Sequence, residues 1–250
     1  MLLREWLAEG PFALVMSSGF FGFFAHAGAL SALVDAGFEP AASGGSSAGA
    51  LVTGLWSGGA RLDTLRDTLA GLHRGQFWDP APGLGVLEGR RFRAMLSGLL
   101  AVSQIESADR PWRASVFDLA ARKTRVLDRG DLATAIHASC AVPLLFQPVR
   151  VGGRLMADGG IADRPGTEGF LTAPRVLHHH LASRSPWRRV GSASMLVPRR
   201  EGLVAVSIAG LPRLGPFALA RGMEAFSRAE RAFRESLGRP VADGKVEVTA

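Results

Sequence analysis

Two short glycine-rich motifs of this sequence each contain a side chain that could take part in catalysis. The first covers residues 45–49 and reads G-S-S-A-G, a G-x-S-x-G pattern in which Gly45 and Gly49 flank Ser47. A serine on a tight strand-to-helix turn holds its hydroxyl clear of the backbone, and glycines two positions away avoid clashes in so sharp a bend. The helix predicted over 48–56 would point its N-terminal amides and its dipole at the serine. Ser47 is therefore predicted to be a nucleophile.

The second pattern is Asp158-Gly159-Gly160, which follows the segment 149–157. That segment predicts a β-hairpin, because apolar residues alternate on either side of a Gly-Gly turn. Asp158 would then lie where a rigid strand ends and a glycine loop begins, which is a frequent position for a functional carboxylate. Taken alone, Ser47 would be interpreted as a helix cap and Asp158 as a turn residue. Together they are the first candidates for an active site.

Two further blocks accompany these patterns. Residues 26–30 read H-A-G-A-L, and residues 138–148 read A-S-C-A-V-P-L-L-F-Q-P. From about residue 14 to residue 163, the order and spacing of the four blocks resemble those of the patatin-like acyl hydrolases, also called patatin-like phospholipases. The corresponding blocks of that family are H-x-G-V-L, G-x-S-x-G, A-S-x-A-x-P-x-x-F-x-P, and D-G-G or D-G-A.

The resemblance implies a serine acyl hydrolase that cleaves carboxylic esters of lipids, of the phospholipase A or lipid acyl hydrolase type. It implies that Ser47 and Asp158 form a catalytic dyad without a histidine, in which Asp158 takes the hydroxyl proton and an acyl-serine forms. The expected partner is a lipid or other acyl ester substrate, and neither a cofactor nor a metal is required. The glycines that would support the two motifs are Gly45, Gly49, Gly159 and Gly160.

One block departs from the family. Its oxyanion loop usually reads G-G-G-x-[RK]-G, whereas alignment on His26 puts S-G-F-F-G-F, residues 18–23, at that place. An oxyanion hole needs backbone N–H groups aimed at the developing charge, and any residue except proline can supply one. We predict that Gly19, Phe20, Phe21 and Gly22 form this loop, and that the two phenylalanines line the substrate pocket.

Alternating predicted strands and helices indicate an α/β fold. The resemblance specifies a patatin-like three-layer α/β/α fold with a central, mostly parallel sheet. With 250 residues, of which 47% are hydrophobic, the chain can bury one substantial core. We expect residues 1–250 to form a single patatin-like domain, in which 164–250 complete the fold. Cys140 is the only cysteine, so no internal disulfide can form, and its apolar neighbours predict a buried thiol.

The formal net charge is +7, and arginine supplies almost all of the positive charge. Pairs such as Arg90-Arg91, Arg188-Arg189 and Arg199-Arg200 could meet an anionic membrane surface, for which a solvated basic surface is the alternative. They are scattered and lack the pattern of an RNA-binding module, so no nucleic-acid partner is expected. The apolar run 11–34 is interrupted by serines, glycines and a histidine, which predicts neither a membrane span nor a signal peptide. The expected location is the cytoplasm, and peripheral membrane contact stays open.

Two segments of the second half of the chain can be interpreted in more than one way. Residues 216–237 predict a long amphipathic helix with basic residues outside, and docking on the sheet is favoured over lying on a membrane. Residues 167–198 predict loops and short elements. Within them, the run His178-His179-His180 is expected at the surface or in a loop rather than at a metal or catalytic site.

Two other functions compete with the dyad. An α/β-hydrolase triad would use Ser47, Asp158 and one of His178, His179 or His180, in the chain order that such enzymes share. However, only 46 residues precede Ser47, which is too few for the strands that normally come before that elbow. A non-catalytic lipid-binding relative is the second alternative, and the altered oxyanion loop is the feature that favours it. The oligomeric state does not follow from the sequence.

Overall fold

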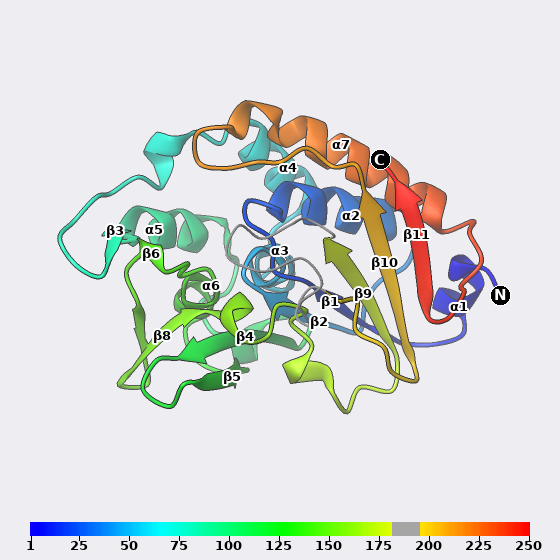
Figure 1. The fold of residues 1–250 in the computed structure, drawn as a ribbon, viewed down its shortest axis with the longest axis horizontal. Coiled ribbons are helices and arrows are strands. Elements are labelled where there is room, and N and C mark those ends of the chain that lie inside the picture. The colour runs from blue at the N-terminus through cyan, green and yellow to red at the C-terminus, as the bar shows by residue number, and fades with distance from the viewer. Residues whose placement is uncertain (182–195) are drawn as a thin grey trace.

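A sheet of nine strands organises the computed structural model, which describes residues 1–181 and 196–250 (Figure 1). Six strands run parallel in the spatial order β11-β10-β9-β1-β2-β4. Their bounds are β1 (Ala13–Met16), β2 (Ala42–Ser46), β4 (Trp112–Asp118), β9 (Val176–Leu181), β10 (Leu203–Ala209) and β11 (Lys245–Thr249). Three antiparallel strands extend the sheet beyond β4: β5 (Lys123–Leu127), β7 (Val149–Val151) and β8 (Arg154–Asp158).

Helices connect the strands. They are α1 (Leu3–Ala8), α2 (Phe23–Asp35), α3 (Ala48–Ser57), α4 (Leu62–Ala70), α5 (Arg90–Leu99), α6 (Leu132–Ser139) and α7 (Gly222–Ser236). Short 3-10 helices lie at η1 (Arg74–Gln76), η2 (Ile105–Ser107), η3 (Gly159–Ile161), η4 (Glu168–Phe170) and η6 (Leu219–Arg221). A separate two-stranded parallel sheet joins β3 (Gly85–Leu87) to β6 (Leu144–Phe146).

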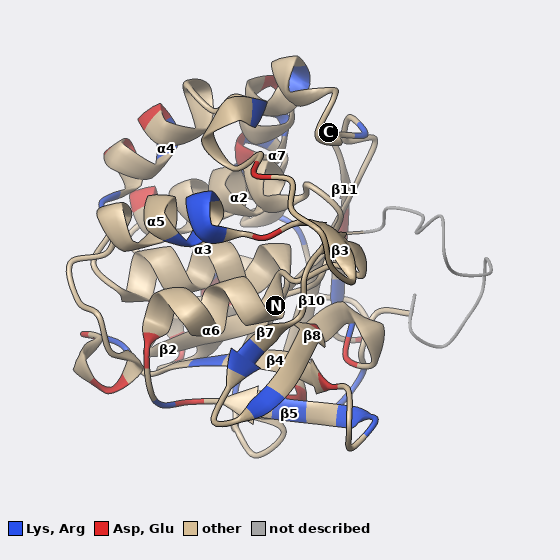
Figure 2. Cartoon of the chain, turned by 90° about the vertical axis from the view of Figure 1, so that its left-hand side faces the viewer, with Lys and Arg blue, Asp and Glu red and all other residues tan. Residues whose placement is uncertain are grey.

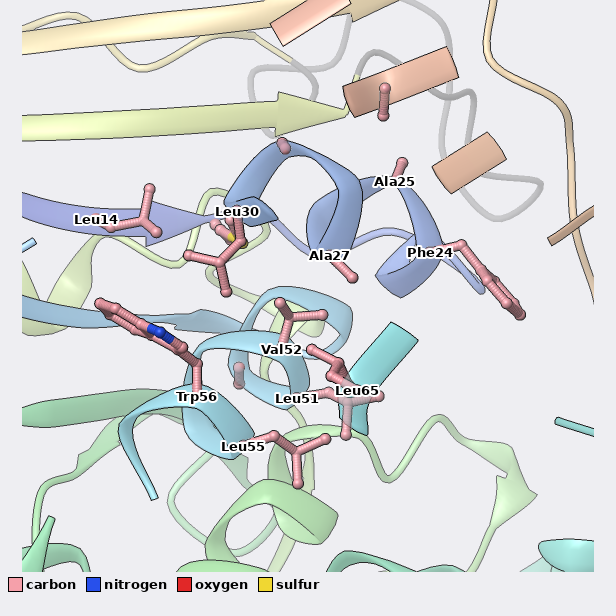
Figure 3. Packing of buried hydrophobic residues seen from close by; sticks show 14 of the residues in the cluster. Leu14, Phe24, Ala25, Ala27, Leu30, Leu51, Val52, Leu55, Trp56 and Leu65 are labelled. Atoms are coloured by element: carbon pink, nitrogen blue, oxygen red, sulfur yellow. The ribbon is translucent and has the colours of Figure 1, made fainter. Parts of the chain in front are cut away.

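Apolar side chains cover both faces of the central strands. In β1, Leu14 and Met16 belong to the large cluster that the helices cover, whereas Ala13 and Val15 belong to a smaller cluster around Phe170. Successive side chains of a strand point to opposite faces, which explains this division. On the helical side, Leu51 and Val52 of α3 lie beside Leu65 of α4 (Figure 3).

The last helix, α7, packs alongside α2 (Figure 1). Gly28 of α2 makes the approach close, because a Cβ there would lie 2.2 Å from the Phe226 carbonyl oxygen. The apolar stripe of α7, which includes Phe226 and Phe233, is buried in this interface. The helix also contacts β10 and β11, so its predicted docking on the sheet is confirmed. No helix within the described ranges is long and apolar enough to cross a bilayer.

The predicted α/β fold with a central, mostly parallel sheet is confirmed, but within 167–198 the expected surface or loop position of His178-His179-His180 is wrong. Val176–Leu181 is β9, a central strand with neighbours on both edges, and its six residues are all buried. The run of three histidines conceals the strand, because histidine counts as polar in any periodicity argument although a neutral imidazole can be buried. Residues 182–195 of that segment, with the Arg188-Arg189 pair, lie outside the described residues.

Two other boundaries differ from the sequence-based predictions. The terminal helix begins at Gly222 instead of residue 216, after the turn η6. Strand β11 was not predicted, although its sequence K-V-E-V-T alternates in the manner of a half-buried edge strand.

Candidate active site

The loops that carry the predicted chemistry meet at the carboxyl ends of neighbouring parallel strands. The loop 17–22 follows β1, and Ser47 follows β2. The strand β1 lies between β2 and β9. The next strand of the chain, β2, is added on one side of β1, and the later strand β9 is added on the other side. Ligands of open α/β sheets bind at such a reversal of strand order, beyond the carboxyl ends of the strands.

Ser47 occupies the predicted sharp turn between β2 and α3. Its backbone lies at φ 52° and ψ −118°, which is a strained conformation for a residue with a side chain. Its N–H donates to Ser139 Oγ at 2.9 Å, and its carbonyl accepts from Cys140 Sγ at 3.3 Å. The end of α6 thus holds the turn in place. Only 7% of Ser47 is exposed.

The two glycines of the G-x-S-x-G pattern serve one packing contact. A Cβ on Gly45 would lie 2.1 Å from the carbonyl oxygen of Met16, and a Cβ on Gly49 would lie at the same distance from the same oxygen. Gly45 also has a φ of 152°, which residues with side chains rarely adopt. The glycines therefore let the end of β1 approach the turn, which brings the loop after β1 beside Ser47.

Asp158 lies directly beyond the end of β2. Strand β4 pairs with β2 over its first half and with β8 over its second half, while β5 occupies the other edge. As a result, β2 and β8 run towards each other along one edge of β4. Ser46 pairs with Ser115, and Asp158 pairs with the next residue, Val116. Measured along β4, the positions of Ser46 and Asp158 are therefore one residue step apart, which is about 3.3 Å.

The loop after Asp158 is held against both neighbouring segments. Asp158 Oδ1 accepts from the Gly160 N–H at 2.8 Å, and the Asp158 N–H donates to the Ala141 carbonyl at 2.9 Å. A Cβ on Gly159 would lie 2.7 Å from Ser46 Oγ, and one on Gly160 would lie 2.3 Å from Ser18 Oγ. We call the junction of Ser47, Asp158 and the loop after β1 the corner. The two glycines are needed there because the segment before Ser47 and the loop after β1 both pack closely against them.

The loop 17–22 presents backbone donors. The Gly22 N–H is engaged, since it donates to the Gly19 carbonyl at 2.8 Å. The N–H groups of Gly19, Phe20 and Phe21 have no hydrogen-bond partner among the described residues. Phe21 has a φ of 55°, so the loop is strained at its centre. Of the four residues predicted for an oxyanion loop, three have a free donor and Gly22 does not.

The root of this loop is fixed by β9, the strand that the sequence analysis missed. The Ser17 N–H donates to the His179 carbonyl at 3.2 Å, and Ser17 Oγ accepts from the Leu181 N–H at 3.0 Å. The Ser17 carbonyl lies 2.7 Å from His26 Nε2. Every polar group of Ser17 is therefore engaged, and the loop leaves the sheet from a rigid point.

A pocket with an almost wholly apolar lining opens beside Ser47. Its volume is about 90 Å³, several times the space that one water needs. Ser47 and Thr68 are its hydroxyl-bearing lining residues, and the Thr68 hydroxyl already donates to the Thr64 carbonyl at 2.7 Å. The predicted position of Phe20 and Phe21 in the lining is confirmed. Helices α3, α4 and α5 supply much of the remaining wall, with residues such as Leu51, Leu55, Leu65, Leu69, Phe92, Met95 and Leu99.

A family model for patatin-like phospholipase matches residues 14–171 of this chain. The chain belongs to the patatin-like phospholipase family. This confirms the family that the four sequence blocks indicated, and the match includes both Ser47 and Asp158.

Relatives of this patatin-like chain are longer proteins. An uncharacterized NTE family protein of Mycobacterium tuberculosis is 35% identical over 155 residues, which are 60% of this chain and 43% of that protein. A second such protein of the same organism is 28% identical over 164 residues, which are 64% of this chain and 28% of that protein. Among solved structures, VipD from Legionella pneumophila matches 90% of this chain and 67% of its own, with a TM-score of 0.61 and 14% identity. That likeness supports the fold.

The histidines of the patatin-like chain form a buried group apart from Ser47. This histidine cluster consists of His26, His178, His179 and His180, all at most 2% exposed. His178 and His180 lie on one face of β9, with ring centroids 5.7 Å apart, and His179 meets His26 on the other. No described histidine is hydrogen-bonded to Ser47, and none lines the pocket. The triad alternative thus gains no support.

The hydrogen bonds assign the protons of two of these rings. His26 Nε2 faces the Ser17 carbonyl, which can only accept, so Nε2 carries the proton. In neutral His26 the other nitrogen, Nδ1, then accepts, and His179 Nδ1 donates to it at 2.9 Å. His179 Nε2 is left as a bare acceptor without a partner among the described residues. A chain of two imidazoles therefore ends on the root of the 17–22 loop.

Burial keeps these rings neutral. It lowers the pKa of His26 to about 3, against the hydrogen bond to the Ser17 carbonyl, which raises it. Burial likewise lowers the pKa of His178 to about 4 and that of His180 to about 3, and it lowers the pKa of His179 well below the ordinary value. None of the four is poised to gain and lose a proton near neutral pH.

Cys140 also lies at the site, directly against Ser47. Its thiol is buried, as predicted, and donates to the Ser47 carbonyl. Burial raises its pKa, and the charge of Asp158 raises it further, so the thiol stays protonated. Within 1–181 and 196–250, no group of three or more histidine, cysteine or acidic side chains is arranged to hold a metal.

Ser17, His26 and Leu181 are the supporting residues that sequence reasoning missed or left without a role. A Cβ on Gly19 would lie 2.5 Å from Leu181 Cδ1, and one on Gly22 would lie 2.2 Å from the same atom, so the end of β9 packs under the loop. One signal was available: V-L-H-H-H-L combines three aliphatic residues with a length of six, which is typical of a buried strand.

Proposed function

We propose that this chain is a serine acyl hydrolase that cleaves carboxylic esters of lipids through Ser47 and Asp158. The observation that carries the proposal is the strained Ser47 turn at the wall of an apolar pocket. A strained backbone persists only where the surrounding structure enforces it, and such strain gathers at functional sites. A hydroxyl held in this way beside an apolar cavity suits an ester whose acyl chain enters the cavity.

Acylation uses three parts of the site. Ser47 Oγ attacks the carbonyl carbon of the ester, and the Asp158 carboxylate takes the hydroxyl proton. The negative charge that develops on the carbonyl oxygen is stabilised by free N–H groups of Gly19, Phe20 and Phe21, together with the N-terminus of α3. When the intermediate collapses, the bond to the alcohol oxygen breaks and Asp158 returns the proton to that oxygen. An acyl-serine remains.

Deacylation repeats these steps with water. Asp158 takes a proton from the attacking water, whose oxygen bonds to the acyl carbon. The bond to Ser47 Oγ then breaks, and the proton on Asp158 returns to that oxygen. The fatty acid leaves and the free enzyme is restored. The position of Asp158, one residue step beyond the end of β2, supports this assignment because a base must lie within reach of the serine.

The pocket supports an apolar acyl chain as the group that is recognised. The Thr68 hydroxyl is satisfied within its own helix, so the wall offers a ligand little beyond apolar surface. Each methylene that moves from water into such a wall contributes about 0.8 kcal/mol. For short soluble esters, kcat/KM should therefore rise with chain length up to the limit that the pocket sets.

The test combines covalent labelling with ester hydrolysis. A fluorophosphonate probe should label Ser47, and p-nitrophenyl butyrate should be hydrolysed. Ser47→Ala should remove both the label and the activity, while Ser46→Ala, one residue away, should retain labelling at position 47. Full activity in Ser47→Ala, or a label on another residue, would reject the assignment. Equal rates on acetate and octanoate esters would reject the lipid substrate.

A further inference from the structure

Exposed apolar side chains gather around the entrance of the pocket. Phe20 is 49% exposed although it also lines the pocket, and Phe217 is 76% exposed. Two more lie on the small β3–β6 sheet, near the lining residues Leu145 and Phe146: Val86 and Leu144, at 50% and 67%. Leu84, directly before β3, is 71% exposed. Exposed apolar groups that gather in this way on a globular protein mark a surface that binds something.

The aromatic part of this surface is continuous. Gly215 brings the 211–218 segment against Phe20, since a Cβ there would lie 3.8 Å from Phe20 Cε1. Two residues later, the ring of Phe217 meets Trp78 with centroids 5.8 Å apart. The Arg74 guanidinium lies over both of these rings, 5.0 Å from each centroid. Aromatic rings beside an arginine suit the boundary between headgroups and acyl chains.

The aliphatic part is held outward by the backbone. Leu144 has a φ of 67°, an unfavourable conformation for a leucine, and its side chain nevertheless points into solvent. Gly85 pairs with Leu144, and its neighbours Leu84 and Val86 are exposed as well. A fold that strains a residue in order to expose an apolar group gains no stability from doing so. Because backbone strain gathers at functional sites, the exposed Leu144 supports a binding role for this surface.

The charge around these side chains is positive. Residues 73–93 contain four arginines and two acidic residues. Asp79 is occupied by the N–H groups of Gly89 and Arg91, and Glu88 pairs with Arg90. Figure 2 looks onto this side of the molecule, with β3 and α5 in view. Arg74 and Arg213, the latter within the 211–218 segment, form no ion pair with a described carboxylate.

We propose that this surface docks on an anionic lipid bilayer. The pocket rim is defined as Phe20, Trp78, Leu84, Val86, Leu144 and Phe217, with Arg74 and Arg213. Its apolar groups would enter the acyl boundary, and the two arginines would meet anionic headgroups. Because Phe20 belongs to both the rim and the pocket wall, docking brings the pocket entrance onto the lipid. The apolar stripe of α7 is buried against α2, so that helix offers no comparable face.

This inference rests on the proposed function only for the purpose of docking. Vesicle binding itself is measured separately from ester hydrolysis. The intact Ser47→Ala protein should co-sediment with vesicles of phosphatidylserine and phosphatidylcholine at low salt, and bind pure phosphatidylcholine vesicles at least tenfold less. Raising the salt to 0.5 M should release most of the protein. The Debye length falls from about 10 Å at 0.1 M salt to about 3 Å at 1 M, so the attraction between the arginines and the headgroups is screened. Vesicle binding by Ser47→Ala tests the rim even if no esterase activity exists.

Charge variants locate the surface. Arg74→Glu should lower the vesicle partition coefficient about tenfold or more, because each arginine near an anionic surface contributes about fivefold and the reversal adds repulsion. The matched control is Arg231→Glu on the exposed side of α7, which should change binding less than twofold. An equal loss in both variants would mean general attraction to the net charge and would overturn the rim.

Apolar variants complete the test. Phe217→Asp and Leu84→Asp should each reduce vesicle binding at least tenfold, whereas Leu171→Asp, at a site 57% exposed near η4, should not. Hydrolysis of soluble p-nitrophenyl butyrate should stay within about twofold in all three variants. Binding that persists in the rim variants, or a wild-type protein that binds neither kind of vesicle, would overturn the proposal.

Discussion

The corner around Ser47 and Asp158 and the histidine cluster are two buried groups of reactive side chains, and they are built in opposite ways. Ser47 follows β2 and Asp158 ends β8, and these two strands run towards each other beside free backbone donors and an apolar pocket. The cluster has four imidazoles, the residue type that most often transfers protons in enzymes, but none lines the pocket. The comparison shows that an open pocket and free backbone N–H donors mark the candidate site better than the type of the side chains does.

The cluster nevertheless contributes through the backbone. Ser17 is bonded to His26, to the carbonyl of His179 and to the N–H of Leu181, and it begins the loop with the free donors. One region is thus proposed to do the chemistry, and the other to fix the geometry that the chemistry needs. Substitutions in the two regions should therefore fail differently.

The largest effect is expected at the corner. Asp158→Asn should lower kcat/KM for p-nitrophenyl butyrate by about 10³–10⁴, because an amide cannot take the serine proton. Asp118→Asn is the matched control, since Asp118 is a fully buried carboxylate of β4 that binds Arg125 and Arg154. That control should lose stability but keep kcat/KM within about threefold in the folded protein. Equal losses of activity in the two variants would mean that Asp158 supports the fold rather than the proton transfer.

The next effect lies where the regions touch. Gly22→Ala would place a methyl group 2.2 Å from Leu181 Cδ1, and the loop must shift to accommodate it. We expect kcat to fall about 10- to 100-fold with KM little changed, since displaced donors stabilise the oxyanion less. Adding Leu181→Ala makes room and should restore part of kcat. A double variant no better than Gly22→Ala would show that Leu181 does not set the position of the loop.

A smaller effect is expected within the cluster. His26→Phe removes the donor to the Ser17 carbonyl, and kcat should fall about tenfold while KM and the fluorescence of the folded state stay the same. His26→Gln keeps an N–H donor in a side chain of similar reach and should retain activity within about threefold. If both variants behave alike, the hydrogen bond has no part in positioning the loop.

The smallest effect concerns stability and pH. The pKa of His178 is about 4 in the folded protein and near 6.5 when exposed, so only the unfolded chain takes up this proton between those values. Above about pH 6.5 the residue adds no pH dependence, and as the pH falls towards 4 it lowers stability by up to about 1.4 kcal/mol per pH unit. His178→Phe should reduce that slope by up to one proton in urea titrations at pH 6.5, 5.5 and 4.5. A slope in His178→Phe equal to that of the unsubstituted protein would contradict this contribution.

Much of this architecture could be predicted from the sequence because the relevant signals are local. The turn at Ser47 and the hairpin before Asp158 each depend on residues only a few positions apart. The strand β9 could not be placed in this way, because its neutral imidazoles are explained by burial between β1 and β10, which are distant in sequence. The shape of the 17–22 loop likewise depends on a distant residue, because Leu181 at the end of β9 packs against Gly19 and Gly22.

The apolar wall of the pocket has a consequence for selectivity. A soluble ester gains about 0.8 kcal/mol for each methylene that leaves water, so its reactivity reports its hydrophobicity. An acyl chain that enters from a bilayer has already left water, and its transfer between two apolar phases releases almost nothing. If membrane lipids are the substrates, as proposed, preference among them would come from shape: the bends and length of a chain against the fixed positions of Leu51, Leu65 and Phe92. The same protein would rank substrates differently in solution and at a membrane.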